Sequence, residues 1–331
     1  MSVRYRSLMK KDVPSLVAQV AAHPVLGPRY GCMIDDLGAA VARTLSFNYE
    51  SACAFEEADG SNTRILGAGL VAFVPSEFLR EVKSTFGLWL GPEMVKRILH
   101  GPNPFLSDSQ VRDGNSRREL NLLVWHFTIH PNDLNRPEVG VTAANAFFNN
   151  FLGFQITEIL AQADSFEQLQ ASRNAGFCYF DPRSGRYGDF PDVNRNNFGR
   201  EPRNLGLDRQ STYTLGHLWS LFCCSPALIG FSLSEQRLLR IALDGGTDQE
   251  LREELCISLT AVKKRWRGIY DRTAESLPRL FADPAQQNTS MHERGKERRR
   301  RLLAYLRGHP EELRPISRTL LRQSHERRQE V

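Results

Sequence analysis

The sequence predicts two domains of different class: an α+β N-terminal domain, with a mixed sheet and flanking helices, and an all-α C-terminal region. Three observations lead to this prediction. The chain has 331 residues, more than the roughly 100–200 of an ordinary domain. Strand-like and helix-like patterns alternate over residues 1–182, whereas helical spacing dominates from residue 212 to 331. Residues 232–331 carry a net charge of +6, and the remainder carries −1.

The elements of the N-terminal domain follow from its apolar periodicity and turn residues. Asp12 is expected as the N-cap of a helix that reaches about Ala22, with Pro14 in its first turn. The turn at 59–62 predicts an antiparallel hairpin. The expected strands are 3–8, 49–57, 64–74, 120–129, 156–162 and one opening at 176–177; further helices are expected at 34–46, in pieces over 75–97, at 139–152 and at 165–175, and 101–117 is expected as a polar loop.

This order of strands and helices resembles the GNAT acetyltransferase fold over roughly residues 1–182, and a PAS-like sensor of mixed α and β structure is the alternative. In the GNAT family, an Arg-x-x-Gly-x-Gly type segment at a helix N-terminus binds the cofactor pyrophosphate. The corresponding residues here are 135–143, where the spacing from Arg136 to Gly140 is one residue too long. Pro137 removes an amide donor, and Glu138 would place a negative charge beside a diphosphate. The resemblance therefore implies a degenerate domain that senses a ligand or mediates assembly.

Two capping boxes and a turn organise the C-terminal region. Ser232 with Glu235 and Thr247 with Glu250 each predict a helix start, and Gly245-Gly246 ends the first helix. Ser258 is then expected as the N-cap of a third helix. That helix has an apolar side with Val262, Trp266, Ile269 and Tyr270 and an opposite side with Thr260, Lys263, Lys264 and Arg267.

This stretch, 231–272, resembles the helix-turn-helix of LuxR-type transcription factors. The matching residues are Gly245, Glu250, Ile257-Ser258, Val262-Lys263 and Ile269-Tyr270. Two residues depart from the family pattern: Cys256 stands where Gly is usual, and Trp266 replaces a smaller aliphatic residue. The resemblance implies that the third helix reads the major groove of double-stranded DNA. The groove-facing positions would be Lys263, Lys264 and Arg267, with Ser258 and Thr260 fixing the helix entry against the backbone.

The segments around this motif are less regular. Residues 183–211 are expected to be a linker or an edge loop with little secondary structure, and 215–231 to be a buried helix and connection. A basic helical tail follows the motif. Its four arginines, Arg298, Arg299, Arg300 and Arg301, are expected at the start of a helix, where cations are disfavoured. The sequence is compatible with two roles for these arginines, contact with phosphate or simple solvation.

Composition and spacing argue against several other sites. Six cysteines show no CxxC and no histidine at ligand spacing, so no metal is expected, and reduced thiols suit a cytoplasmic protein. His126 and His130 would lie roughly 13 Å apart along one strand, which favours structural roles. No cofactor and no catalytic residue is assigned. Arg117-Arg118 is expected to be solvated, and no membrane partner is expected.

The leading hypothesis is therefore a transcriptional regulator that binds double-stranded DNA as a homodimer. Its N-terminal domain would receive a small-molecule signal or mediate assembly. The alternative is an acyl-CoA-dependent N-acyltransferase fused to a DNA-binding tail, and a third interpretation makes the helices a protein-interaction module.

Overall fold

The computed structural model describes residues 2–45, 51–59, 62–133, 135–191, 202–209, 217–281, 291–317 and 319–320. The chain separates into two compact units. Unit 1 comprises Met1–Val111, Arg118–Phe151 and Ile156–Cys223, and unit 2 comprises Arg112–Arg117, Leu152–Gln155 and Cys224–Val331. The predicted domain limits at residues 182 and 212 remain a prediction.

Unit 1 is built on one mixed sheet, as predicted. The described residues form eight strands in the order β1-β2-β3-β4-β5-β8-β6-β7. All neighbours are antiparallel except β4 and β5, which run parallel. The strands are β1 (Ser2–Ser7), β2 (Ser51–Asp59), β3 (Asn62–Val74), β4 (Leu120–Ile129), β5 (Ile156–Ala163), β6 (Cys178–Asp181), β7 (Arg186–Gly188) and β8 (Arg203–Asp208).

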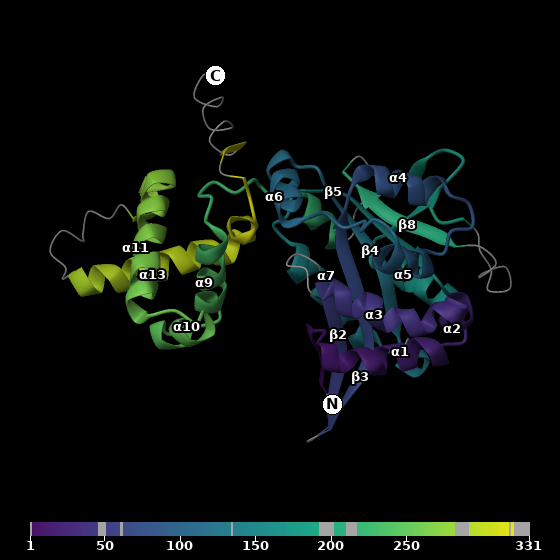
Figure 1. Cartoon of the computed structure of the whole chain (residues 1–331). Helices are drawn as coiled ribbons and strands as arrows, with labels where there is room; N and C mark the ends of the chain where they lie inside the picture. The colour runs from purple at the N-terminus through teal and green to yellow at the C-terminus, as the bar shows by residue number, and fades with distance from the viewer. Residues whose placement is uncertain are drawn as a thin grey trace. The chain divides into compact units, whose positions relative to one another are not determined.

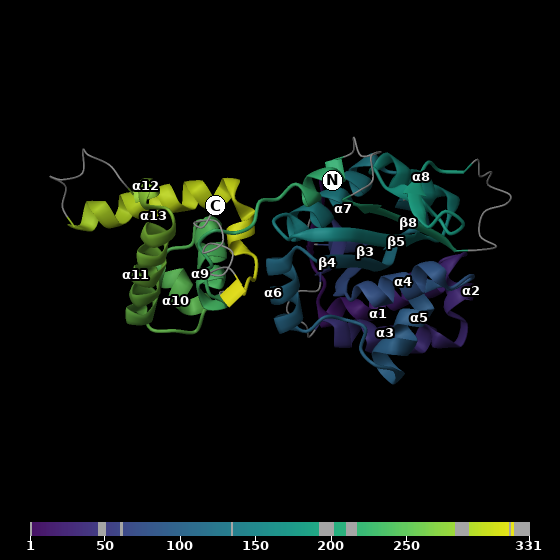
Figure 2. The same cartoon turned by 90° about the horizontal axis from the view of Figure 1, so that it is seen from above.

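Helices cover both faces of this sheet, so unit 1 has three layers. Helices α1, α3, α4 and α5 lie on one face, and α7 and α8 lie on the other (Figure 2). Apolar side chains from β2, β3 and β4 pack against Val139 and Ala146 of α7. The helices of unit 1 are α1 (Val13–Ala22), α2 (Leu26–Tyr30), α3 (Ile34–Thr44), α4 (Ser76–Ser84), α5 (Leu90–His100), α7 (Pro137–Phe151) and α8 (Phe166–Asn174). A further helix, α6 (Asp108–Arg117), belongs to unit 2 from Arg112 onward.

Two sequence-based expectations for this part of the chain are wrong, and a third is met only in part. The expected polar loop at 101–117 contains helix α6, which starts after a capping pair: the amide of Ser107 donates to Oε1 of Gln110 (2.9 Å), and the amide of Gln110 donates to Oγ of Ser107 (3.4 Å). The segment 183–211 carries β7 and β8, and β8 inserts between β5 and β6. The helix expected within 215–231 is, in its described part, a short 3-10 helix (His217–Phe222) followed by irregular backbone.

One local expectation also needs correction. Asp12 stands at the N-cap position of α1, but its side chain makes no capping hydrogen bond. The Asp12 carboxylate instead accepts from the guanidinium of Arg6 (2.6 Å) and from the backbone amide of Met9 (2.8 Å). This ion pair ties β1 to the turn that precedes α1.

Unit 2 is helical, and its helix starts agree with the predicted caps (Figure 1). Both capping boxes form, at Ser232 with Glu235 and at Thr247 with Glu250. The Ser258 side chain accepts from the amide of Ala261 (3.1 Å). The helices are α9 (Leu233–Leu243), α10 (Asp248–Glu254), α11 (Leu259–Ser276), α12 (Pro278–Phe281) and α13 (Met291–Gly308), followed by a 3-10 turn (Pro310–Leu313).

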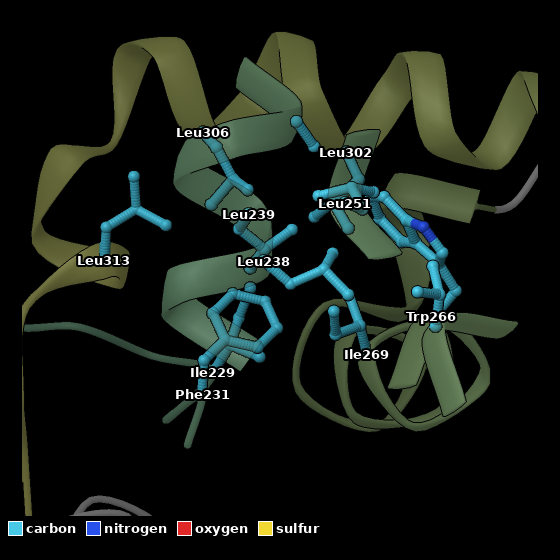
Figure 3. Close-up of a cluster of buried hydrophobic side chains, with 12 residues drawn as sticks. Ile229, Phe231, Leu238, Leu239, Leu251, Trp266, Ile269, Leu302, Leu306 and Leu313 are labelled. Atoms are coloured by element: carbon cyan, nitrogen blue, oxygen red, sulfur yellow. The ribbon is translucent and has the colours of Figure 1, made fainter. Parts of the chain in front are cut away.

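The core of unit 2 includes the basic tail helix as well as the three predicted helices. Leu302 and Leu306 of α13 are fully buried and point toward Leu239 and Leu251 of the preceding helices (Figure 3). Trp266 and Ile269 of α11 close the same cluster. Helix α13 is therefore an integral part of the helical unit and not an appended tail.

Candidate functional site

The outer face of α11 brings together the residues predicted to contact DNA. Val262 and Ile269 are completely buried on the core side of this helix. The predicted contact residues Thr260, Lys263, Lys264 and Arg267 are all exposed, as is the N-cap Ser258. The fold thus presents a hydroxyl and three cationic side chains along one side of the first three turns.

Charge changes sign along the exposed face of α11. Its N-terminal half carries the three cations, whereas the exposed charged residues on the same side further along are Asp271 and Glu275. Arg272 is half-buried and pairs with Glu235 of α9 (3.4 Å). An anion as large as a nucleic-acid backbone would therefore be attracted only to the N-terminal half of the helix.

The turn that leads into α11 contains a strained residue. Cys256 has φ of +50°, in the left-handed region that favours glycine. Its side chain is exposed, so the residue contributes little to the core. The departure from the family pattern at this position is therefore accommodated in the conformation that a glycine would adopt.

The four arginines of the tail have different surroundings. Helix α13 begins at Met291, so these residues lie in its middle; the expectation that they occupy a helix start is wrong. Arg298 and Arg300 are exposed, and Arg300 pairs with Glu297 (2.7 Å). Arg301 is half-buried and also pairs with Glu297 (2.8 Å), whereas Arg299 points into the packing between helices.

A second candidate site lies in unit 1, where the two parallel strands separate. Pairing of β4 with β5 ends at Val124 and Ala161, although β4 continues beside β3 as far as Ile129. Trp125 has no partner on β3, because the register shifts by one residue at this point. Bulges of this kind end strand pairing and redirect side chains, and they occur often beside functional sites.

Polar atoms without partners gather at this bulge. The ring atoms Nε1 of Trp125 and Nε2 of His126 are buried and have no hydrogen-bond partner among the described residues. Nδ1 of His126 lies 2.8 Å from the hydroxyl of Tyr30. Burial, together with the nearby His23, lowers the pKa of His126 to about 4, so the ring is neutral at pH 7.

An ion pair lies next to this histidine and tyrosine. The guanidinium of Arg29 donates to Asp164 (2.8 Å) and stacks 3.6 Å from the ring centroid of Trp89. Burial raises the pKa of Asp164 to about 6, even though Arg29 acts in the opposite direction. Burial and the charge of Asp164 also raise the pKa of Tyr30 well above its ordinary value. This group could hold a polar ligand or exchange a proton with one.

The N-terminus of α7, where the GNAT resemblance places the cofactor, is occupied by an ion-pair network. Arg136 donates to Glu57 (2.7 Å), Asp133 (3.0 Å) and Glu138 (2.8 Å). Glu138 also accepts from its own backbone amide, and this bond together with Arg136 lowers the pKa of its carboxyl. The carboxylate of Glu138 therefore lies where a phosphate would otherwise meet the helix amides.

Sequence reasoning assigned His126 a structural role and missed Tyr30, Arg29 and Asp164. These residues come from α2 and from the end of β5, and no local motif connects them. Among the described residues, no group of three or more His, Cys, Asp or Glu could hold a metal ion. Within the same residues, no helix has the length and apolar character needed to cross a membrane.

Comparisons with known proteins give structural similarities only. No protein-family model and no curated protein matches the sequence. An uncharacterised protein from Bacillus halodurans is 12% identical, and the match covers 62% of this chain and 83% of that protein with a TM-score of 0.36. A chimera of spermidine N-acetyltransferase SpeG from Vibrio cholerae with hSSAT is 10% identical, and the match covers 63% of this chain and 96% of the chimera with a TM-score of 0.35. These TM-scores are too low to support a conclusion about fold or activity.

Proposed function

We propose that unit 2 binds double-stranded DNA through the N-terminal half of α11 and that the chain acts as a transcriptional regulator. The observation that carries this proposal is the exposed face with Thr260, Lys263, Lys264 and Arg267. It lies opposite an apolar side on which Val262 and Ile269 are completely buried. A helix held from behind in this way can enter the major groove, where its first turns meet the base edges. Cations on those turns suit both guanine edges and phosphates.

Two copies of the chain would bind one site. A single short helix contacts only a few base pairs, so tight binding by so small a module commonly requires a two-fold dimer on a pseudo-palindrome. The homodimer is part of the proposal, and sedimentation of the full chain with a selected duplex would measure its stoichiometry.

The test compares two double variants with the same loss of charge. Replacing Lys263 and Lys264 by Ala should weaken binding to a duplex selected by the wild-type chain at least about 30-fold, because a direct contact is worth about 1–3 kcal/mol. Replacing the exposed Lys10 and Lys11 of unit 1 by Ala removes equal charge and should leave affinity unchanged. Gel-shift titrations in which both variants bind like wild type would refute the proposal.

The salt dependence separates DNA binding from a protein-interaction module. Binding to duplex DNA should weaken steeply with rising salt, with a slope of log K against log salt of about −0.9 for each phosphate contacted. A full chain that shows no salt-dependent binding to any duplex would exclude this function.

A second candidate function is acyl transfer, or acyl-CoA binding, by unit 1. It is favoured by the end of β4–β5 pairing at the Trp125 bulge, where buried ring nitrogens of Trp125 and His126 have no hydrogen-bond partner within the described part of the chain. The network around Arg136 and Glu138 argues against a pyrophosphate site of the usual kind.

Calorimetric titration of the full chain with acetyl-CoA tests this second candidate. Micromolar binding that is lost in a His126→Gln variant would support it, and Arg117→Gln serves as a control because Arg117 is exposed. No heat of binding at millimolar acetyl-CoA would exclude it.

A further inference from the structure

One arginine of the tail helix contacts three parts of the predicted DNA-binding motif. Nη1 of Arg299 lies 2.8 Å from Oδ1 of Asp248, the first residue of α10. Nη2 donates to the carbonyl of Gly246 in the turn between α9 and α10 (2.7 Å). The guanidinium carbon lies 4.6 Å from the ring centroid of Trp266 on α11. A single planar side chain thus joins the turn, the second helix and the third helix.

The groups that Arg299 contacts are also joined to each other. Nε1 of Trp266 donates to the same Oδ1 of Asp248 (3.3 Å), so this oxygen receives two donors. Trp266 is buried and stacks on Tyr270, with ring centroids 5.5 Å apart. Because the indole is held on one side by Tyr270 and on another by Arg299, the rotation of α11 about its axis depends on this contact.

The neighbouring arginines provide a contrast. Arg298 and Arg300 are exposed, whereas Arg299 is only partly exposed and uses both terminal nitrogens, Nη1 toward Asp248 and Nη2 toward Gly246. A guanidinium whose two terminal nitrogens already donate within the protein is poorly placed to form a bidentate contact with a phosphate. The run of four arginines therefore contains residues with different roles.

We infer that Arg299 is a positioning residue for DNA recognition: it sets the angle at which α11 presents Lys263, Lys264 and Arg267, without touching DNA itself. This inference rests on the proposed DNA-binding function. Its consequence is that loss of Arg299 reduces discrimination between DNA sequences, whereas loss of a phosphate contact reduces binding to all sequences equally.

The experiment uses the full chain with Arg299→Gln and a matched Arg300→Gln control that removes the same charge one residue away. Affinities for a duplex selected by the wild-type chain and for an unrelated duplex are measured over a range of salt. Arg299→Gln should lower the ratio of these affinities at least about fivefold and leave the salt slope unchanged. Arg300→Gln should leave the ratio unchanged and, if Arg300 contacts phosphate, make the slope shallower by about 0.9.

Two further measurements keep the inference testable if Arg299→Gln destabilises unit 2. Arg299→Lys keeps the charge beside Asp248, but a lysine cannot donate to Asp248 and Gly246 in one plane. Its ratio of affinities for the selected and the unrelated duplex should therefore lie between those of wild type and Arg299→Gln. Asp248→Asn should lower the ratio as well, and combining it with Arg299→Gln should add less than the two single effects together.

Each outcome is decisive. Equal behaviour of Arg299→Gln and Arg300→Gln, or a shallower salt slope for Arg299→Gln, overturns the positioning role while the proposed function stands. Failure of the wild-type chain to bind any duplex overturns the proposed function and the inference together. A lowered ratio at an unchanged slope, with partial recovery in Arg299→Lys, supports the inference.

Discussion

His126 should make the stability of the protein depend on pH in a definable window. Its ring is buried in unit 1, where Tyr30 contacts Nδ1 and Nε2 has no partner among the described residues. Burial and His23 lower its pKa from 6.5 to about 4. Between these two values the unfolded chain binds a proton at this position and the folded chain does not.

The magnitude follows from the gap between the two pKa values. At 1.36 kcal/mol for each pH unit, a gap of about 2.5 corresponds to about 3 kcal/mol. Since the unfolded state binds more protons, the free energy of unfolding should fall by this amount as pH falls from 6.5 to 4. Above pH 6.5 the contribution of His126 to the free energy of unfolding no longer changes with pH.

The assay is denaturant unfolding of wild type and His126→Gln between pH 7.5 and 4.5, and the difference between the two free energies is followed. Asp164 titrates in the same range with the opposite sign, because burial raises its pKa to about 6 and the folded state then holds the extra proton. Its contribution is common to both proteins and cancels in the difference. His100→Gln, which removes an exposed histidine, is the control and should leave the pH dependence as in wild type.

A difference that stays constant within about 0.5 kcal/mol over this range would refute the reasoning. The same conclusion would follow if the imidazole of His126 titrated near pH 6.5 in NMR spectra of the folded chain. Either result would mean that the ring is solvated or has a charged partner.

Three further predictions concern packing and backbone strain. Leu302→Ala should destabilise unit 2 by about 2–5 kcal/mol, since the side chain is fully buried. Leu303→Ala, at a partly buried position, should cost less than half as much. Equal losses of the two variants in denaturant unfolding would contradict the packing of α13. Cys256→Gly should stabilise by about 0.5–1 kcal/mol in the same assay, because φ is +50° there; a loss of stability would contradict this. Gly91→Ala should destabilise by at least about 1 kcal/mol, because a Cβ there would clash with the hydroxyl of Tyr30. If Tyr30→Phe does not recover part of this loss, the clash is not the cause.

The helix starts of unit 2 could be predicted because their causes are local. A Ser or Thr side chain reaches an amide three residues later, so Ser232, Thr247 and Ser258 mark helix starts that depend on four residues each. Strand β4 was likewise predicted at Leu120–Ile129, since a long apolar run bounded by polar residues is a local signal.

The insertion of β8 could not be predicted in this way. This strand pairs Asp208 with Glu158, about fifty positions apart, inside a stretch rich in glycine, asparagine and arginine. Pairing over such a distance depends on which sheet edge is free. The residues near Arg203–Asp208 do not indicate which strand offers that edge. Helix α6, in contrast, has a local start signal that the prediction overlooked, because Ser107 and Gln110 cap each other as Ser232 and Glu235 do.

By itself, the sequence determined the class of each region, the caps that start α9, α10 and α11, and the cationic side of α11, because each depends on residues within a few positions of one another. The tertiary structure alone decided that Tyr30 meets His126 and that Arg299 joins Gly246, Asp248 and Trp266. Those contacts connect residues about 30 to 100 positions apart in the chain. Only the packing of whole helices and strands brings such residues together.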